Sequence, residues 1–473
     1  MMQSIRRWFG YDAQREGREE RVPPYSLRRQ TSPADYLRPQ RWNWDLLLRP
    51  LDERLSRRAE QELPKSIVVG LRFFWLDGLF ATISDNFYVT FLPLFALSFN
   101  ASNGTIGLLT AITNLFGTIA LFPGAKMVET VGRRKPVVVW AGGIVGRLSL
   151  IFLVVLPFIT ESYLVAIGVI IGVSAIRAFM GNFGNPGWTS LTADLVPPAM
   201  RGRYFASRNR VMGIAALVVG PIAGWLIRRG DGLFSLPHFG YQLIFFLALV
   251  FGMVSTFFFA NIPEPEHSGG KILPHQRGDL RKALRGAPTF MWFVASAFIW
   301  NLAIQVAAPF FNVYLITGLH GTASLVGLSA GITSLFALFG QSLFGRLIDT
   351  KGNFWVQRLT GLLIPLLPAL WILVATPWQA VLISVVGGFA WAGFNLSNFN
   401  LLLDLTPASQ RARAVALYQT VVFAAAVVGP LAGGYLTDLA GFKLIFAVSF
   451  IGRIAGILIF LVRVRAPRPT SDR

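Results

Sequence analysis

Four ionisable residues stand inside long apolar runs in the first half of the chain, where an ionised side chain is costly and is retained mainly for function. Asp77 and Asp85 lie in the first apolar run, and Arg147 and Arg177 lie in the third and fourth. In a helix, a separation of eight residues is about 80° beyond two full turns, so both carboxylates project toward one side. We predict that Asp85, with Asp77 and Arg177, couples proton movement to a change of conformation; static ion pairs that hold the helices together are the alternative.

A second set of polar and aromatic side chains lies in the fourth, seventh and tenth apolar runs. Buried amides need hydrogen-bond partners, which neighbouring helices or a bound substrate can supply. The chain has 40 Phe and 13 Trp, so an apolar, aromatic cavity for amphipathic or lipophilic cargo is expected. The predicted cavity residues are Asn182, Asn185, Trp188, Trp300, Asn301, Gln305, Trp391, Asn395 and Asn398.

These residues must be positioned by membrane helices. The 473 residues are 53% hydrophobic and 14% charged, with a mean hydropathy of +0.54, whereas soluble proteins carry about 25% charged residues. Runs of roughly 20 apolar residues are long enough to cross a bilayer, and their continuous rather than alternating pattern excludes a β-barrel. The sequence predicts an all-α membrane protein with twelve helices at 66–98, 104–125, 135–158, 162–192, 204–229, 240–262, 287–317, 323–345, 355–375, 378–404, 412–437 and 440–463.

The distribution of basic residues indicates the orientation of these helices. The net charge is +20, with 43 Lys and Arg, but few of these lie mid-span or on the odd-numbered connections. The rest gather at the termini, on the even-numbered connections and at adjoining helix ends, which is the positive-inside pattern. We therefore expect an inner-membrane protein with both termini in the cytoplasm, and we attribute the basic excess to topology and membrane lipid rather than to nucleic acid.

Metal, redox and enzymatic chemistry have no support in the residue types. The chain has no Cys, and its four His show no ligand spacing. We predict no metal, no cofactor and no enzymatic activity, and a monomer whose partners are a small-molecule substrate, protons and membrane lipid. The polar, Arg-rich beginning of the chain also shows no cleavable signal sequence.

An internal repeat divides the chain into two halves. Gly107 and Thr113 recur 220 residues later, and Asn185 and Asp194 recur 210 residues later as Asn395 and Asp404. Six-helix halves that repeat in the same topology imply a pseudo-two-fold axis along the membrane normal, with the substrate site at their interface. The predicted organisation is a hydrophilic cytoplasmic extension at 1–65, a bundle at 66–262, a cytoplasmic linker at 263–286, and a bundle with a short tail at 287–473.

Within the extension, residues 42–63 interleave Trp and Leu with Arg and Glu. That pattern suggests a helix lying on the cytoplasmic membrane surface. A solvated tail that only reinforces the orientation is the alternative.

The connections after the second and eighth apolar runs carry a recurring motif. They read AKMVETVGRRK and GRLIDTKGN, and they resemble the Gly-x3-Asp-Arg-x-Gly-Arg-Arg signature of the major facilitator superfamily, with Ala125, Thr130 and Thr350 as departures. The resemblance covers about 66–463 and implies a cytoplasmic latch of helix-end acids opposed by Arg, which must break when the halves move. Its residues here are Glu129, Gly132, Arg133, Arg134, Gly345, Asp349 and Gly352.

Two further elements resemble the drug:proton antiporter branch of this superfamily. Arg177 followed by Gly181 is similar to the Arg-x3-Gly element of proton-coupled members, although Met180 replaces the usual Gln. Gly-Pro elements, which kink helices and allow close packing, occur at Gly220, Pro221 and Gly224 and again at Gly429, Pro430 and Gly433. The third and twelfth helices are usually peripheral in the superfamily, which implies a structural or lipid-facing role for Arg147 and Arg453.

Three functions are compatible with the sequence. The first is a secondary transporter that exports small amphipathic or lipophilic compounds by proton-coupled alternating access. The second is uptake or facilitated diffusion of a polar solute such as a sugar or an amino acid. The third is a transporter-like membrane scaffold or assembly factor, which the long extension and the altered signature favour.

Overall fold

The computed structural model describes residues 65–160, 162–197, 200–233, 238–264, 288–406 and 411–464. Within these residues, twelve helical segments are long and apolar enough to cross a membrane, and they confirm the predicted spans. Several helices run beyond their apolar stretch; the second continues until Gly132, whose positive φ of 68° ends it. The predicted surface helix at 42–63 and most of the predicted linker lie outside the described residues.

The first half contains six spans, some of them interrupted. Prolines, which cannot donate the helical hydrogen bond, mark several irregular positions. The third span is divided by a π-helical turn. The elements are α4 (Lys65–Tyr88), α5 (Leu92–Ser98), α6 (Asn103–Val131), α7 (Arg134–Val138), η2 (Val139–Val145), α8 (Gly146–Leu148), α9 (Leu150–Ile159), α10 (Tyr163–Leu195), α11 (Arg201–Leu233) and α12 (Phe239–Ala260).

The second half repeats the arrangement. Its first span is broken near Pro309, as the first span of the chain is broken near Pro93, and both breaks precede a short final helix. The elements are α14 (Pro288–Ala307), α15 (Phe310–Thr317), α16 (Ala323–Lys351), α17 (Asn353–Leu363), α18 (Leu366–Leu373), α19 (Pro377–Asp404), α20 (Arg411–Ala440) and α21 (Phe442–Arg463).

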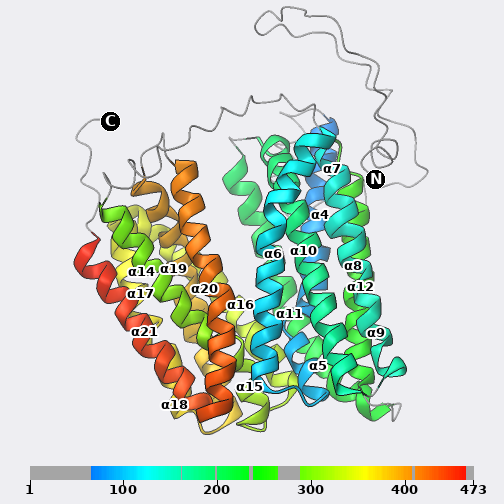
Figure 1. The fold of residues 1–473 in the computed structure, drawn as a ribbon. Coiled ribbons are helices and arrows are strands. Elements are labelled where there is room, and N and C mark those ends of the chain that lie inside the picture. The colour runs from blue at the N-terminus through cyan, green and yellow to red at the C-terminus, as the bar shows by residue number, and fades with distance from the viewer. Residues whose placement is uncertain are drawn as a thin grey trace, which may run out of the picture.

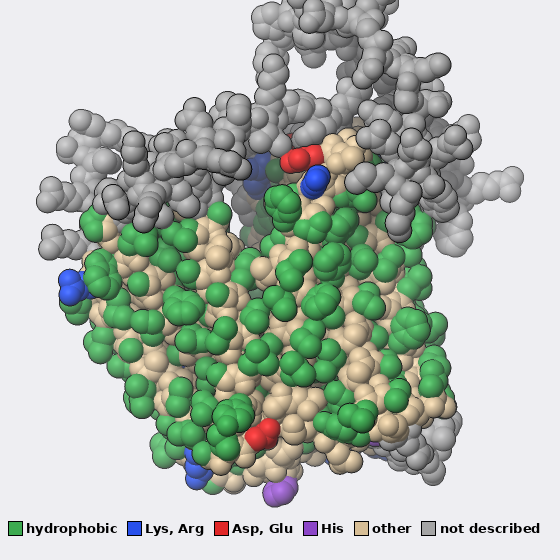
Figure 2. All heavy atoms as spheres, in the orientation of Figure 1, with side chains coloured by type: hydrophobic (Ala, Val, Ile, Leu, Met, Phe, Trp, Pro, Cys, Tyr) green, Lys and Arg blue, Asp and Glu red, His purple; other side chains and the backbone are tan. Residues whose placement is uncertain are grey.

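The two six-helix bundles lie side by side, meet at one end and diverge toward the other (Figure 1). We call the end where α5 finishes and α6 begins the closed end, and the end where α4 begins and α21 finishes the open end. On the face shown in Figure 2, hydrophobic side chains cover the middle of both bundles, and coloured charged side chains lie near the two ends. That distribution suits a bundle surrounded by lipid.

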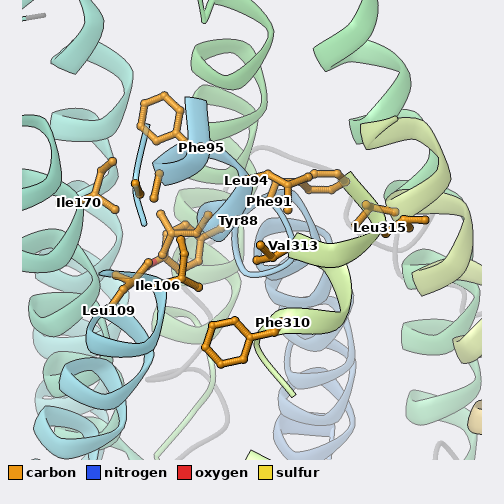
Figure 3. Packing of buried hydrophobic residues seen from close by; sticks show 14 of the residues in the cluster. Tyr88, Phe91, Leu94, Phe95, Ile106, Leu109, Ile170, Phe310, Val313 and Leu315 are labelled. Carbon is orange, nitrogen blue, oxygen red and sulfur yellow. The ribbon is translucent and has the colours of Figure 1, made fainter. Parts of the chain in front are cut away.

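The hydrophobic core explains why the halves meet at the closed end. One buried cluster includes Phe91 and Leu94 of the first half together with Phe310, Val313 and Leu315 of the second (Figure 3). The two other buried clusters each belong to a single half and lie toward the open end. Among the described residues, the buried apolar cluster that both bundles share therefore lies at the closed end.

Two crossed helix pairs complete the closed end, α6 with α20 and α11 with α16. Their backbones approach closely at glycines: a Cβ on Gly220 would lie 2.7 Å from the carbonyl oxygen of Gly327, and one on Gly107 would overlap the carbonyl oxygen of Pro430. The Asp438 carboxylate of α20 also accepts a hydrogen bond of 2.7 Å from the backbone N–H of Gly104, at the start of α6. Small residues at the interface let the halves pack without a gap.

We predict that Gly107→Ala weakens the closed end, because the added methyl group must push α6 away from α20. A lower midpoint of thermal unfolding in detergent is expected, together with faster modification of cysteines introduced at this end. Gly168→Ala is the matched control, since nothing lies within 4 Å of a Cβ at that position. Equal unfolding midpoints for the two variants would contradict the prediction.

Candidate functional site

A cavity of about 600 Å³ lies within the first half. Among the described residues it is lined by side chains and backbone of the first half alone, from α4, α6, the third span, α10, α11 and α12. Five charged side chains line it: Asp77, Asp85, Arg147, Arg177 and Arg208. The rest of the lining is largely apolar or small, so the charges stand against a mainly apolar wall.

Asp85 and Arg177 form an ion pair across the cavity. The Arg177 Nη2 atom lies 2.6 Å from the Asp85 Oδ1 atom, and the two residues come from α4 and α10. The Asp85 side chain is 57% exposed, whereas that of Arg177 is 13% exposed. Arg177 also lies over the ring of Tyr88, 4.6 Å from its centroid. The arginine is thus fixed by packing, and the carboxylate remains accessible from the cavity.

Asp77 is bound more deeply, two turns away on the same helix. It is 6% exposed, accepts a hydrogen bond of 2.6 Å from the Ser255 hydroxyl, and lies 4.0 Å from Arg208. The Arg208 guanidinium packs 4.6 Å from the centroid of the Phe74 ring. A Cβ on Gly78 would overlap this guanidinium, so only glycine lets Arg208 approach α4 so closely.

Arg208 was not predicted as a site residue from the sequence. It counted among the basic residues at helix ends, because it lies only a few positions inside the fifth span. Burial of a cation among apolar neighbours is the signal that distinguishes it. The glycine beside Asp77 was a further hint that a bulky partner approaches there.

Arg147 lines the cavity and contacts α12, so of the two roles that the resemblance implies for it, structural or lipid-facing, its contacts support the structural one. Its Nη1 atom donates hydrogen bonds to the carbonyl oxygen of Gly252 and, at 2.9 Å, to the Thr256 hydroxyl, both on α12. The π-helical turn just before Arg147 inserts an extra residue and changes the direction in which later side chains point. Arg453 is 2% exposed and donates to the Ile364 carbonyl, which is a structural contact.

The predicted cavity residues occupy several places. Asn185 and Trp188 line the large cavity, whereas Asn182 lies against Gly117 of α6. In the second half, a separate cavity of about 20 Å³ is lined by Trp300, Asn301 and Asn398, among others.

Three further candidates of the second half lie outside both cavities. The Trp391 ring packs 5.6 Å from that of Phe394, Gln305 lies against Gly429, and Asn395 is exposed. Within the described residues, the structure does not place second-half side chains in the large cavity.

The signature motif lies at the open end. Arg134 is buried and bonded to the Asp194 carboxylate, and its backbone N–H donates to Glu264 at 2.6 Å. Glu129 and Asp349 are exposed, and among the described residues neither forms an ion pair. Among the described residues, the Arg134–Asp194 ion pair and the Asn353–Asp404 hydrogen bond at this end each join groups of the same half.

The second copy of the motif also lies between the second and third spans of its half, but its residues make different contacts. Gly352 has a φ of 84° and separates α16 from α17, while Gly345 is half-buried with nothing within 4 Å of a Cβ. Asn353 donates a hydrogen bond of 2.8 Å to Asp404, the repeat mate of Asp194. Both halves therefore tie the start of their third span to the end of their fourth through the same acidic position.

The Gly-Pro elements lie at helix contacts. Gly220 and Gly224 of α11 face Gly327 and Ala323 of α16, across the interface between halves. Gly429 and Gly433 of α20 face Gln305 and Val306 of α14. Pro221 and Pro430 lie inside their helices, and the carbonyl oxygen of Pro430 is the atom that Gly107 approaches.

Two six-helix bundles of membrane-spanning length, the first of which contains a charged cavity, define a polytopic membrane protein of the transporter class. The Major Facilitator Superfamily model matches residues 74–399 and 302–473. The chain therefore belongs to this superfamily; it is a multi-pass membrane transporter of small molecules and not an enzyme.

Individual relatives are distant. The chain is 25% identical over 420 residues to the multidrug resistance protein MdtG of Salmonella arizonae, an overlap of 85% of this chain and 96% of that protein. Its fold is similar to an inward-facing bacterial homologue of the iron transporter ferroportin, with a TM-score of 0.66, 16% identity and coverage of 84% and 99%. The nucleoside transporter NupG gives a TM-score of 0.66 at 14% identity, with coverage of 84% and 100%.

We predict that Arg134→Gln destabilises the first half, because Asp194 and Glu264 lose a buried cationic partner. Hydrogen bonds to charged groups contribute about 1.5–3 kcal/mol each, and the partial exposure of Asp194 places the expected loss at the lower end. Arg133→Gln, at the exposed neighbouring position, should change stability by less than about 0.5 kcal/mol. Thermal or denaturant unfolding in detergent measures both; similar effects would show that Arg134 is only a turn residue.

Proposed function

We propose that this protein is a secondary active transporter that exports small amphipathic compounds by alternating access, coupled to proton movement. The observation that carries the proposal is the Asp85–Arg177 ion pair inside a cavity of a bundle that is closed at one end. The Asp85 carboxylate is accessible, and Arg177, on another helix, is largely buried. A proton that binds Asp85 therefore changes a contact between two helices.

Alternating access is supported by the way the halves meet. One apolar cluster and glycine contacts seal the closed end, while buried clusters toward the open end stay within single halves. Rocking the bundles about the cavity would open one end and close the other. With the termini in the cytoplasm of an inner-membrane protein, as the basic residues favour, the described state is inward-facing.

Proton coupling is supported by the asymmetry of exposure in the ion pair. When the exposed Asp85 carboxylate binds a proton, the charge that attracts Arg177 is removed, and α4 and α10 lose this link. A change in the energy of a contact between helices shifts the balance between conformations by that amount. Asp77 accepts a hydrogen bond from Ser255 and lies near Arg208. It is a second carboxylate whose protonation would alter contacts between helices in the same way.

The export of amphipathic cargo is supported by the lining and by the relatives. Aromatic and aliphatic side chains, among them Tyr88, Val89, Trp188 and Phe259, form much of the cavity wall. The name of the MdtG relatives refers to multidrug resistance. Uptake of a polar solute is the second candidate, favoured by the five charged side chains in the cavity.

We predict that Asp85→Asn abolishes proton-driven transport in proteoliposomes while leaving cargo counterflow measurable. The amide retains the shape of the side chain but cannot exchange a proton, so only the coupled step is lost. Asp85→Glu is the matched control, because it keeps an ionisable group, and it should retain part of the driven flux. Driven, pH-dependent transport by the asparagine variant at the wild-type rate would exclude Asp85 as the coupling residue.

We also predict that Glu129→Gln combined with Asp349→Asn favours the state described here. Both acids are exposed at the open end, and they can stabilise only a state in which the halves approach there. A single cysteine in place of Gly181, which lines the cavity of this Cys-free chain, should react faster with an impermeant maleimide added at the cytoplasmic side. The same cysteine in the parent background is the control, and unchanged rates would leave the motif a simple turn.

A further inference from the structure

The charges of the cavity do not balance. Two carboxylates and three guanidinium groups line it, which leaves one positive charge in excess. Asp85 is paired with Arg177 at 2.6 Å, and Asp77 lies 4.0 Å from Arg208. Arg147 is the third cation; it shares the electrostatic influence of Asp77 with Arg208, but among the described residues no carboxylate lies within 4.0 Å of it. A charge inside a membrane protein is costly unless a partner is present for at least part of the working cycle.

Among the described residues, only one of the three nitrogen atoms of the Arg147 guanidinium makes hydrogen bonds. Its Nη1 atom makes both hydrogen bonds, to the Gly252 carbonyl and to the Thr256 hydroxyl. Its Nε and Nη2 atoms have no hydrogen-bond partner in the part of the chain that the structure describes. A guanidinium group presents a planar fork of donors that matches the two oxygens of a carboxylate or phosphate.

The side chain is held in place rather than left mobile. A Cβ on Gly252 would lie 2.8 Å from the Arg147 Cδ atom, so the glycine provides the channel along which the side chain runs. The Thr256 hydroxyl, which Arg147 contacts, itself donates to the carbonyl oxygen of Gly143 at 3.0 Å. These contacts fix one edge of the guanidinium on α12, and a fixed donor binds a ligand with less loss of entropy.

The second half provides a contrast. Arg453 is also an intramembrane arginine bonded to a neighbouring helix carbonyl, but it is 2% exposed and lines neither cavity. Its contacts show what a purely structural arginine looks like in this fold. Arg147 differs because it is one of the residues that line the 600 Å³ cavity.

We infer that Arg147 binds an anionic group of the cargo, so that the preferred substrates are lipophilic compounds with one carboxylate or a similar acidic group. The anion would pair with the excess positive charge, and the apolar part would lie along the wall formed by residues such as Tyr88, Trp188 and Phe259. The inference rests on the proposed transport function and adds the charge of its cargo. Because it concerns binding, it can be tested separately from proton coupling.

The test measures binding of three naphthalene compounds of similar size to the purified full-length protein in detergent. The probes are 1-naphthylacetate, its neutral amide, and the cationic 1-naphthylethylammonium; calorimetry or Trp fluorescence gives the affinities without a proton gradient. The anion should bind at least tenfold more tightly than the amide, and the cation should bind more weakly than the anion. A tenfold difference corresponds to about 1.4 kcal/mol.

Variants then assign the selectivity to Arg147. Arg147→Gln should reduce anion affinity about tenfold without changing amide affinity, and Arg147→Lys should retain part of it. Thr256→Val, which removes one hydrogen bond to the guanidinium, should give a smaller, severalfold loss. Arg228→Gln, at an exposed position near the end of α11 that does not line the cavity, is the matched control.

The outcomes separate this inference from the proposed function. Equal affinities for the three probes, no binding of the anion, or an equal loss for anion and amide in Arg147→Gln would each overturn the anion site. Retained anion selectivity with no proton-driven transport would overturn the coupling alone.

Discussion

Close backbone contact between the two bundles at one end is the constraint on which the rest of the structure depends. Gly107 against Pro430 and Gly220 against Gly327 bring helices together more closely than any side chain would allow. Straight, rigid bundles pressed together at one end must separate toward the other. The divergence of the bundles toward the open end therefore follows from glycines that lie well away from the charged residues.

The pseudo-symmetric fold carries asymmetric chemistry. The first half contains the five charged side chains of the large cavity, whereas the second half encloses about 20 Å³ lined by aromatic and amide side chains. The repeat mate of Asp85 is Gln305, which is polar but cannot ionise at physiological pH. The internal repeat thus provides two similar bundles, and the sequence differences between them place the charges of the large cavity in the first.

The sequence predicted the spans well, because length and hydropathy are local properties that the bilayer imposes on every helix. It also selected Asp85 and Arg177, since any intramembrane charge is a strong signal. The direction of the Arg147 side chain was not predictable, because it depends on a π-helical turn that no pattern of residues in the sequence indicates. The separation of Trp300 from the large cavity was equally hidden, since it follows from how second-half side chains pack against one another.

The contacts at the open end limit how the halves can close there. Arg134 is already engaged by Asp194 and Glu264 of its own half, so it stabilises the first bundle instead of reaching across. Within the same motif, Arg133 is exposed. Exposed charges exchange water for a partner at little net cost, so a latch built from them can form and break repeatedly. Arg134 is buried although Asp194 is partly exposed, so breaking their ion pair would leave a buried cation without this partner, which suits the pair to holding the first bundle together.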